Sequence, residues 1–319
     1  MTSAREAKIG PWLVALGAAL WGTESAWRIP LNDLFPNADV LVFWEHVILV
    51  VLALPLVLPR LHELRTTSAR TIGWLIFSGV AGSAVGAVLF TLALKHGNPT
   101  VVNVVLNIQP VLSTTAAYFL FRDRLAPGFF LWAGIAVVAG MVLVGLLAPG
   151  FDFTVDAGTA FALICALFWG LSTVAGRGVM LEMSLPLAAG LRVMIGLVSM
   201  TIILGARGLF HGDTLWPAAA SANTTKTILF LVLLAGLSGW VPLLIYFQGL
   251  KLTRASTAGY FEMMQTLAAG IITWGFFHAA LGPLQVVAAI VLVIAVALVQ
   301  RAQEQTALPP VAPTRASPG

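Results

Sequence analysis

Charged residues are scarce in this sequence. Asp, Glu, Lys and Arg make up 9% of its 319 residues, whereas ordinary soluble domains carry roughly a quarter. Apolar residues make up 59%, and the mean hydropathy is +0.95. This balance excludes a soluble domain and indicates an integral membrane protein. The formal net charge of +4 does not imply a nucleic-acid partner, because so few charges are better explained by their place relative to the bilayer.

Cysteine and catalytic motifs are also lacking. The single cysteine, Cys165, lies in an apolar run, which excludes a disulfide framework and a thiolate metal site, and we expect it to be packed in the interior. The sequence has no HExxH, no GxSxG, no paired aspartates, no Cys/His cluster and no Walker A motif. We therefore expect no metal and no cofactor. The same absences argue against an intramembrane enzyme and against direct ATP hydrolysis.

Long apolar runs are abundant. A transmembrane helix needs about 20 mostly apolar residues. Clusters of charge, Pro and Asn divide the chain into ten such runs, and the sequence therefore predicts an all-α integral membrane fold. The predicted spans are 11–29, 39–58, 70–94, 99–121, 127–147, 157–178, 185–206, 226–250, 255–276 and 282–300.

The distribution of basic residues predicts the orientation. If both termini are cytoplasmic, 12 of the 17 Lys and Arg residues fall on the cytoplasmic side, four fall on the opposite side, and Arg192 lies within a span. Cytoplasmic loops carry an excess of Lys and Arg, so this division favours both termini inside.

Two halves of the chain resemble each other. "AALWGTESAWRIP" (18–30) matches "CALFWGLSTVAGRG" (165–178), and "FTLALKHGNPTVVN" (90–103) matches "YFQGLKLTRASTAG" (246–259). Because the matches occur in the same order, we predict a duplicated five-helix unit. The predicted division is a first repeat at 1–150, a second at 151–305 and a disordered Pro-rich tail at 306–319.

An odd number of spans in each repeat makes the second copy enter the membrane from the opposite face. The sequence therefore predicts two inverted five-helix repeats, an architecture of secondary transporters that bind substrate near the midplane between the repeats. The Trp-Gly of each repeat's first helix, and the "QP" helix followed by a short basic turn and "L-x-P", resemble the drug/metabolite transporter superfamily, EamA branch. Within it, the chain is most similar to the YddG-type amino-acid exporters of bacterial inner membranes.

The resemblance covers about residues 10 to 300 and implies export of small metabolites by alternating access. It also implies a multi-pass protein of the inner (plasma) membrane. The family usually has Gly-Glu in the turn after the fourth helix of each repeat. Here those turns read Arg122-Asp123 and His278-Ala279, so only the first keeps an acid.

Ionisable residues within spans are candidates for the site, because charge at the bilayer centre is costly and normally faces the interior or a cavity. Arg28, at an outer helix end, is expected to snorkel to the interface or to pair with Glu24 at i, i+4. Arg192 and Glu262 lie at similar depth, so they form either a structural ion pair or part of the site. The candidates are Glu24, Glu45, His46, Arg192 and Glu262. Of these, Glu45, His46 and Arg192 are assigned to coupling or to a structural ion pair.

Amide and aromatic side chains extend the predicted cavity. Polar residues recur at helical spacing on the fourth and ninth spans, where they either line the cavity or join helices by hydrogen bonds. Aromatic residues lie in mid-span on the first, sixth, eighth and ninth helices. The predicted substrate-binding set is Trp21, Glu24, Asn103, Asn107, Trp169, Trp240, Tyr246, Tyr260, Glu262 and Gln265.

Together these features predict a secondary transporter that exports amino acids or similar small zwitterions, with a lipid bilayer and a small-molecule substrate as its partners. The alternatives are export of other metabolites or drug-like cations, a channel or scaffold, and an intramembrane enzyme. The internal duplication predicts that one chain is functional as a monomer.

Overall fold

The computed structural model describes residues 4–123, 125–147, 150, 156–277 and 282–304, and these are helical with short connections. The predicted tail at 306–319 and the His278-Ala279 turn lie outside the described residues. The first half contains α1 (Ala4–Trp21), a 3-10 turn (Gly22–Glu24), α2 (Ser25–Leu34), α3 (Ala38–Val57), a 3-10 segment (Leu58–Arg65), α4 (Ala69–Phe77), a first π segment (Ser78–Val85), α5 (Gly86–His96), α6 (Pro99–Leu106), α7 (Gln109–Phe121) and α8 (Pro127–Leu143).

The second half follows the same order of spans, with two short helices, α11 and α12, in the connection after α10. It contains α9 (Ala157–Val179), α10 (Leu185–Ala206), α11 (Gly212–Leu215), α12 (Ala218–Ala222), α13 (Thr224–Val232), a second π segment (Leu233–Trp240), α14 (Val241–Leu252), α15 (Ala255–Glu262), α16 (Met264–Phe277) and α17 (Pro283–Glu304).

The all-helical fold of ten spans agrees with the prediction from apolar runs. In the described part of the chain, seven helical runs are long and apolar enough to cross a bilayer, and α8 is a shorter apolar helix. The first and ninth predicted spans are also helical, but each is interrupted, the first at the 3-10 turn and the ninth at Met263. The fourth is interrupted before Gln109, where Pro110 in the first turn of α7 lacks the N–H that a continuous helix needs.

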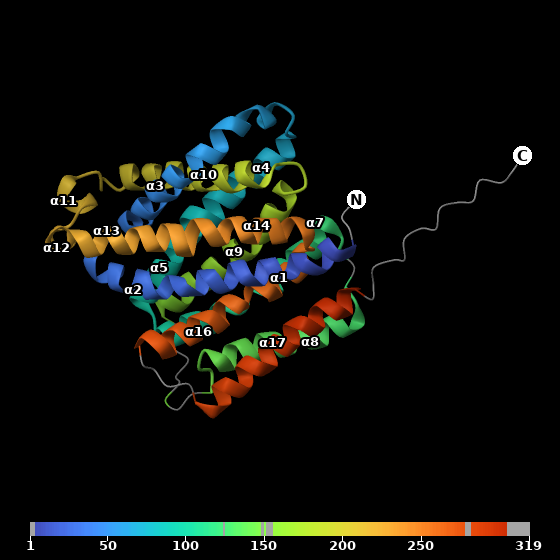
Figure 1. Ribbon diagram of the computed structural model, residues 1–319. Helices are drawn as coiled ribbons and strands as arrows, with labels where there is room; N and C mark the ends of the chain where they lie inside the picture. The colour runs from blue at the N-terminus through green and yellow to red at the C-terminus, as the bar shows by residue number, and fades with distance from the viewer. Residues whose placement is uncertain (1–3, 124, 148–149, 151–155, 278–281, 305–319) are drawn as a thin grey trace, which may run out of the picture.

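The packing of the helices repeats between the two halves, and Figure 1 shows two of its helix pairs, α1 beside α14 and α8 beside α17. Helix α1 packs along α14, and its counterpart α9 packs along α5 and the first π segment. Two further contacts join counterpart helices directly, α3 with α10 and α8 with α17, and α7 of the fourth span packs on α15 of the ninth. The π segments also occupy corresponding places, in the third and eighth spans. This pattern supports the duplication, whereas the boundary at 150–151 and the inverted insertion stay predictions.

The Trp-Gly motifs allow two close approaches between helices. A Cβ atom on Gly22 would lie 2.5 Å from the carbonyl oxygen of Gln265. One on Gly170 would lie 3.1 Å from the carbonyl oxygen of Gln109, the corresponding residue of the first repeat. Glycine at these positions lets the first helix of each repeat approach the interrupted helix closely, and the neighbouring Trp21 and Trp169 both line the cavity described below.

We expect Gly22→Ala to destabilise the protein. The added methyl group would collide with backbone, which cannot rotate away, and overpacking of this kind costs about 1–3 kcal/mol. The measurement is the thermal unfolding midpoint in detergent. Gly134→Ala on α8 is the matched control, because a Cβ there meets nothing within 4 Å. An unchanged midpoint for Gly22→Ala would show that the helices separate without cost.

The connection before α4 and the connection before α10 are joined by hydrogen bonds. Each contributes a glutamate that accepts from the serine preceding the other connection's helix. Glu63 accepts hydrogen bonds from the backbone N–H (3.1 Å) and hydroxyl (2.8 Å) of Ser184, before α10. Glu182 accepts the same pair from Ser68, before α4, both at 3.0 Å. These bonds hold the pKa of Glu182 below its usual range. The two connections are therefore joined by carboxylates that satisfy exposed helix N-termini.

Candidate functional site: a polar cavity between the repeats

A cavity with a water-accessible volume of about 130 Å³ lies among helices of both repeats. Its lining comes from the first three spans and α7 of the first repeat, and from α9, α10, α14 to α16 and the second π segment of the second repeat. Nine of the predicted residues line it: Trp21, Glu24, Glu45, His46, Trp169, Arg192, Tyr246, Glu262 and Gln265.

Four predicted binding residues lie outside this lining. Asn107 is buried, donates to the backbone carbonyl oxygen of Asn103 one turn earlier and accepts from Thr266, so its amide joins the fourth and ninth spans. Trp240 and Tyr260 are buried in the apolar core, and Tyr260 packs edge-on against Phe129. Helical spacing predicted that these polar and aromatic side chains line the cavity. The rotation of each helix points them away from it instead.

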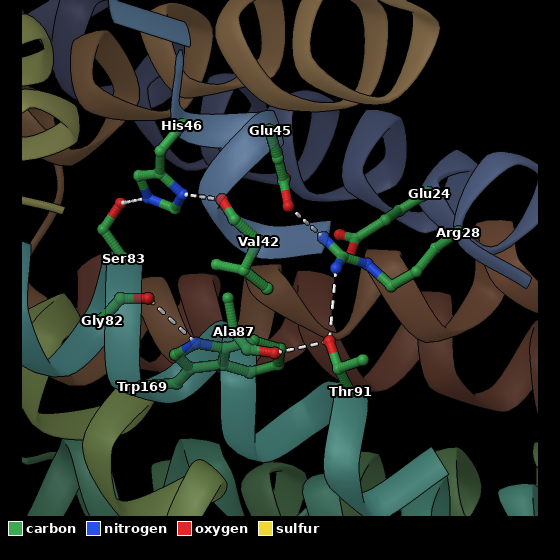
Figure 2. Close-up of polar contacts among 10 residues, drawn as sticks. All are labelled: Glu24, Arg28, Val42, Glu45, His46, Gly82, Ser83, Ala87, Thr91 and Trp169. Carbon is green, nitrogen blue, oxygen red and sulfur yellow. Dashed lines mark hydrogen bonds and ion pairs between the residues drawn. The ribbon is translucent and has the colours of Figure 1, made fainter. Parts of the chain in front are cut away.

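One end of the cavity holds three charged side chains, shown in Figure 2. The guanidinium of Arg28 pairs with Glu24, one turn earlier, and donates to Glu45 on α3 at 2.6 Å. Its remaining nitrogen donates to Thr91 on α5 at 3.3 Å. We call Glu24, Arg28 and Glu45 the acidic triad, because two carboxylates share one cation.

The interface position predicted for Arg28 is wrong. Arg28 is only 2% exposed and ranks among the largest fully buried side chains, whereas its pairing with Glu24 agrees with the i, i+4 alternative. The reason is Glu45, which α3 brings to the same place. A guanidinium with carboxylates on two sides is stable in the interior, so it has no reason to extend to the membrane surface.

His46 follows Glu45 on α3 and is held by two hydrogen bonds. Its Nδ1 lies 2.8 Å from the carbonyl oxygen of Val42, and its Nε2 lies 2.8 Å from the hydroxyl of Ser83 (Figure 2). A carbonyl oxygen only accepts, so Nδ1 carries the hydrogen and Nε2 is free to accept from Ser83. His46 thus connects α3 with the first π segment.

The carboxylate of Glu262, at the end of α15, receives hydrogen bonds from three neutral donors. Tyr246 on α14 donates at 2.7 Å, Thr173 on α9 at 2.9 Å and Gln109 on α7 at 2.6 Å. A carboxylate has about four lone-pair sites, so these three donors leave room for one more. Glu262 therefore links helices of both repeats and still presents an acceptor to the cavity.

Arg192 has no ion-pair partner among the described residues. The structural bridge between Arg192 and Glu262 considered above is not formed, because Tyr246, Thr173 and Gln109 surround the carboxylate instead. The Arg192 guanidinium lies 5.6 Å from the ring centroid of Phe247. Its Nη2 also lies close to Gly82, because a Cβ atom added to that glycine would be 2.9 Å from Nη2. A cation without a carboxylate partner is thus present on the cavity wall.

Two aromatic pairs flank the cavity at corresponding positions of the repeats. Trp21 packs on Tyr246 with ring centroids 4.7 Å apart, and Trp169 packs on Phe90 at 5.3 Å. The indole N–H of Trp169 also donates to the carbonyl oxygen of Gly82 at 3.1 Å, as Figure 2 shows. Sequence reasoning found both tryptophans through the repeat.

Several lining residues were not predicted. Gln109 and Thr173 support Glu262, and Ser83 supports His46. Gln109 lies in the "QP" motif and is the repeat counterpart of Gln265, which was a usable signal. Thr173 lies one turn after Trp169, on the same face of α9. For Ser83 the sequence holds no such signal, because the π segment changes which side chains face inward.

We expect cysteines at positions 21 and 169 to react with small water-soluble maleimides. Both tryptophans line the cavity, and each indole stands where a smaller side chain would be open to water. The measurement is labelling of Trp21→Cys and Trp169→Cys in a Cys165→Ala background. Trp240→Cys is the matched control, because Trp240 is 7% exposed within the core. If both cavity positions stay unlabelled under every transport condition, they are packing residues.

A cavity lined by both halves of a duplicated membrane helix bundle defines a membrane transporter, with a lipid bilayer around it and a small molecule as substrate. The chain belongs to the EamA-like transporter family, whose profile matches residues 8–146 and again residues 156–301. This confirms the resemblance to the EamA branch and the presence of the repeated unit.

A curated relative and a solved structure cover nearly the whole chain. The chain is 24% identical over 298 residues to the riboflavin transporter ImpX of Fusobacterium nucleatum subsp. nucleatum, covering 90% of this chain and 96% of that protein. A solved crystal structure is similar with a TM-score of 0.72 and 18% identity, covering 96% of this chain and 100% of the other. The second likeness concerns the fold alone.

Proposed function

We propose that this transporter exports small zwitterionic metabolites, with amino acids as the leading class, by alternating access. One observation carries the proposal: Arg192, which has no ion-pair partner in the described part of the chain, and Glu262, a carboxylate with a vacant acceptor site, line the same cavity. We assign the substrate carboxylate to Arg192 and the substrate ammonium to Glu262.

The relation between these two side chains suits an α-amino acid. They line one cavity, yet no hydrogen bond or ion pair joins them within the described part of the chain. An α-amino acid carries its carboxylate and ammonium on one carbon, so it requires a cation and an acid that are close but unpaired. A site whose charges already neutralise each other would gain little from a zwitterion.

The size of the cavity favours a small substrate. The volume of about 130 Å³ is several times the minimum of about 10–15 Å³ that a single water needs, so the cavity admits a small organic molecule such as an amino acid. A flavin is considerably larger and would need the lining to move. Flavin transport is nevertheless the second candidate, because the relative from Fusobacterium is named a riboflavin transporter.

The direction and placement of transport belong to the same proposal. The excess of Lys and Arg at one end of the spans supports cytoplasmic termini, and the resemblance to bacterial exporters supports the inner membrane and the outward direction. Because both repeats that line the cavity come from one chain, we propose that the monomer is functional.

Counterflow in proteoliposomes without nucleotide tests the function. The purified chain is loaded with a panel of amino acids, riboflavin and quaternary amines, and exchange of each labelled compound is measured. Saturable amino-acid exchange supports the proposal. Exchange of riboflavin alone, or of quaternary amines alone, would contradict it. An ohmic current would indicate a channel. The absence of both flux and current would leave an intramembrane enzyme as the remaining alternative.

A further inference from the structure

The ionisable side chains that line the cavity do not balance in charge. In their ionised forms, Glu24, Glu45 and Glu262 carry three negative charges, and Arg28 and Arg192 carry two positive ones. His46 counts as neutral, because its Nδ1 donates to the Val42 carbonyl oxygen and its Nε2 accepts from Ser83. In that state the lining has one uncompensated negative charge within a low-dielectric membrane protein, where such a charge is costly.

The excess is located at the acidic triad. Each acid uses one oxygen on Arg28, Oε1 of Glu24 and Oε2 of Glu45. Their other oxygens have no hydrogen-bond partner among the described residues. The carboxylate side chains are 17% and 10% exposed, whereas the guanidinium between them is 2% exposed, so the acids are the more open part of this end of the lining.

The triad is not part of what the repeated fold requires. With Trp21 aligned on Trp169, the counterpart of Glu24 is Ser172, and the counterpart of Arg28 is Gly176. Both halves form the same bundle, but only the first has this charged cluster. An arrangement needed for folding the five-helix unit would be expected in both copies, so a role in recognition accounts better for its presence in one.

We propose that the acidic triad is a second subsite, for a cationic group on the substrate side chain, so that the preferred substrates are basic amino acids of net charge +1. This inference rests on the proposed function, in which Arg192 and Glu262 hold the α-carboxylate and α-ammonium. A side-chain ammonium then occupies the free oxygens of Glu24 and Glu45. The loaded cavity is electrically neutral.

Competition between matched substrates tests the subsite. Counterflow of L-lysine is compared with that of Nε-acetyl-L-lysine, which has the same chain but no side-chain charge, and of norleucine. We expect the wild-type protein to prefer lysine by about tenfold or more. In Glu24→Gln and in Glu45→Gln the triad becomes neutral, so the ratio of lysine counterflow to that of the uncharged analogues should fall to near one. Each variant leaves Arg28 one carboxylate partner, which protects folding.

The control is Glu63→Gln, the same change at an exposed connection, where the lysine preference should stay at its wild-type value. Equal exchange of lysine and norleucine by the wild-type protein overturns the subsite while leaving the proposed function intact. Transfer of one proton with each norleucine, recorded with a pH dye inside the vesicles, also overturns it, because a proton then neutralises the triad. Loss of every amino-acid flux contradicts the proposed function itself.

Discussion

Arg192→Met is expected to abolish transport without destabilising the protein. If the guanidinium binds the substrate carboxylate, its removal costs about 2–5 kcal/mol of binding free energy, or roughly 30-fold to more than 1,000-fold in apparent affinity. The fold should tolerate the change, because no carboxylate among the described residues depends on Arg192 for its ion pair. The measurements are amino-acid counterflow and the thermal unfolding midpoint.

Arg70→Met is the matched control. Arg70 also lies against an aromatic ring, Trp74 at 6.0 Å, but it is exposed on α4 and away from the cavity. Its substitution should leave counterflow unchanged. Arg192→Lys keeps the charge but loses the planar fork, so we expect partial activity with weaker affinity. A fall in stability for Arg192→Met, with transport reduced only in proportion, would show that Arg192 is structural.

Glu262→Gln is expected to abolish transport while the protein still inserts and purifies normally. The change removes the negative charge assigned to the substrate ammonium. The new amide can still accept from Gln109, and the hydroxyls of Tyr246 and Thr173 can rotate to accept its N–H groups. The loss of charge-assisted hydrogen bonds is offset by the removal of a buried charge, so stability should change by less than about 2 kcal/mol.

The double variant Arg192→Met with Glu262→Gln separates binding from scaffolding. Removing both charges leaves no buried charge uncompensated at this end of the cavity. A stable but inactive double variant supports the site. Wild-type transport by the double variant would assign Glu262 to scaffolding. Glu182→Gln is the matched control, since Glu182 also accepts hydrogen bonds from a neighbouring connection but lies outside the cavity.

Much of the fold could be predicted from sequence because it depends on properties of single residues. Scarce charge and long apolar runs require membrane-spanning helices, whatever their neighbours are. The duplicated Trp-Gly motif predicted a shared place for Trp21 and Trp169, and the adjacent glycines let the first helix of each repeat approach the interrupted helix closely. The ionisable residues of the interior could also be predicted, since charge in a span must face the interior. Glu45, His46 and Glu262 were found in this way.

What the sequence by itself determined is therefore the membrane class, the ten spans, the duplication and the charged residues of the cavity other than Arg28. Only the tertiary structure decided which charges meet. Arg28 lies in the interior because α3 brings Glu45 to it, and Arg192 stays without a carboxylate partner because three neutral donors surround Glu262. Asn107 and Tyr260 face neighbouring helices instead of the cavity, because helix rotation follows packing. Partners of this kind come from spans far apart in the chain, and no local pattern contains the distance between them.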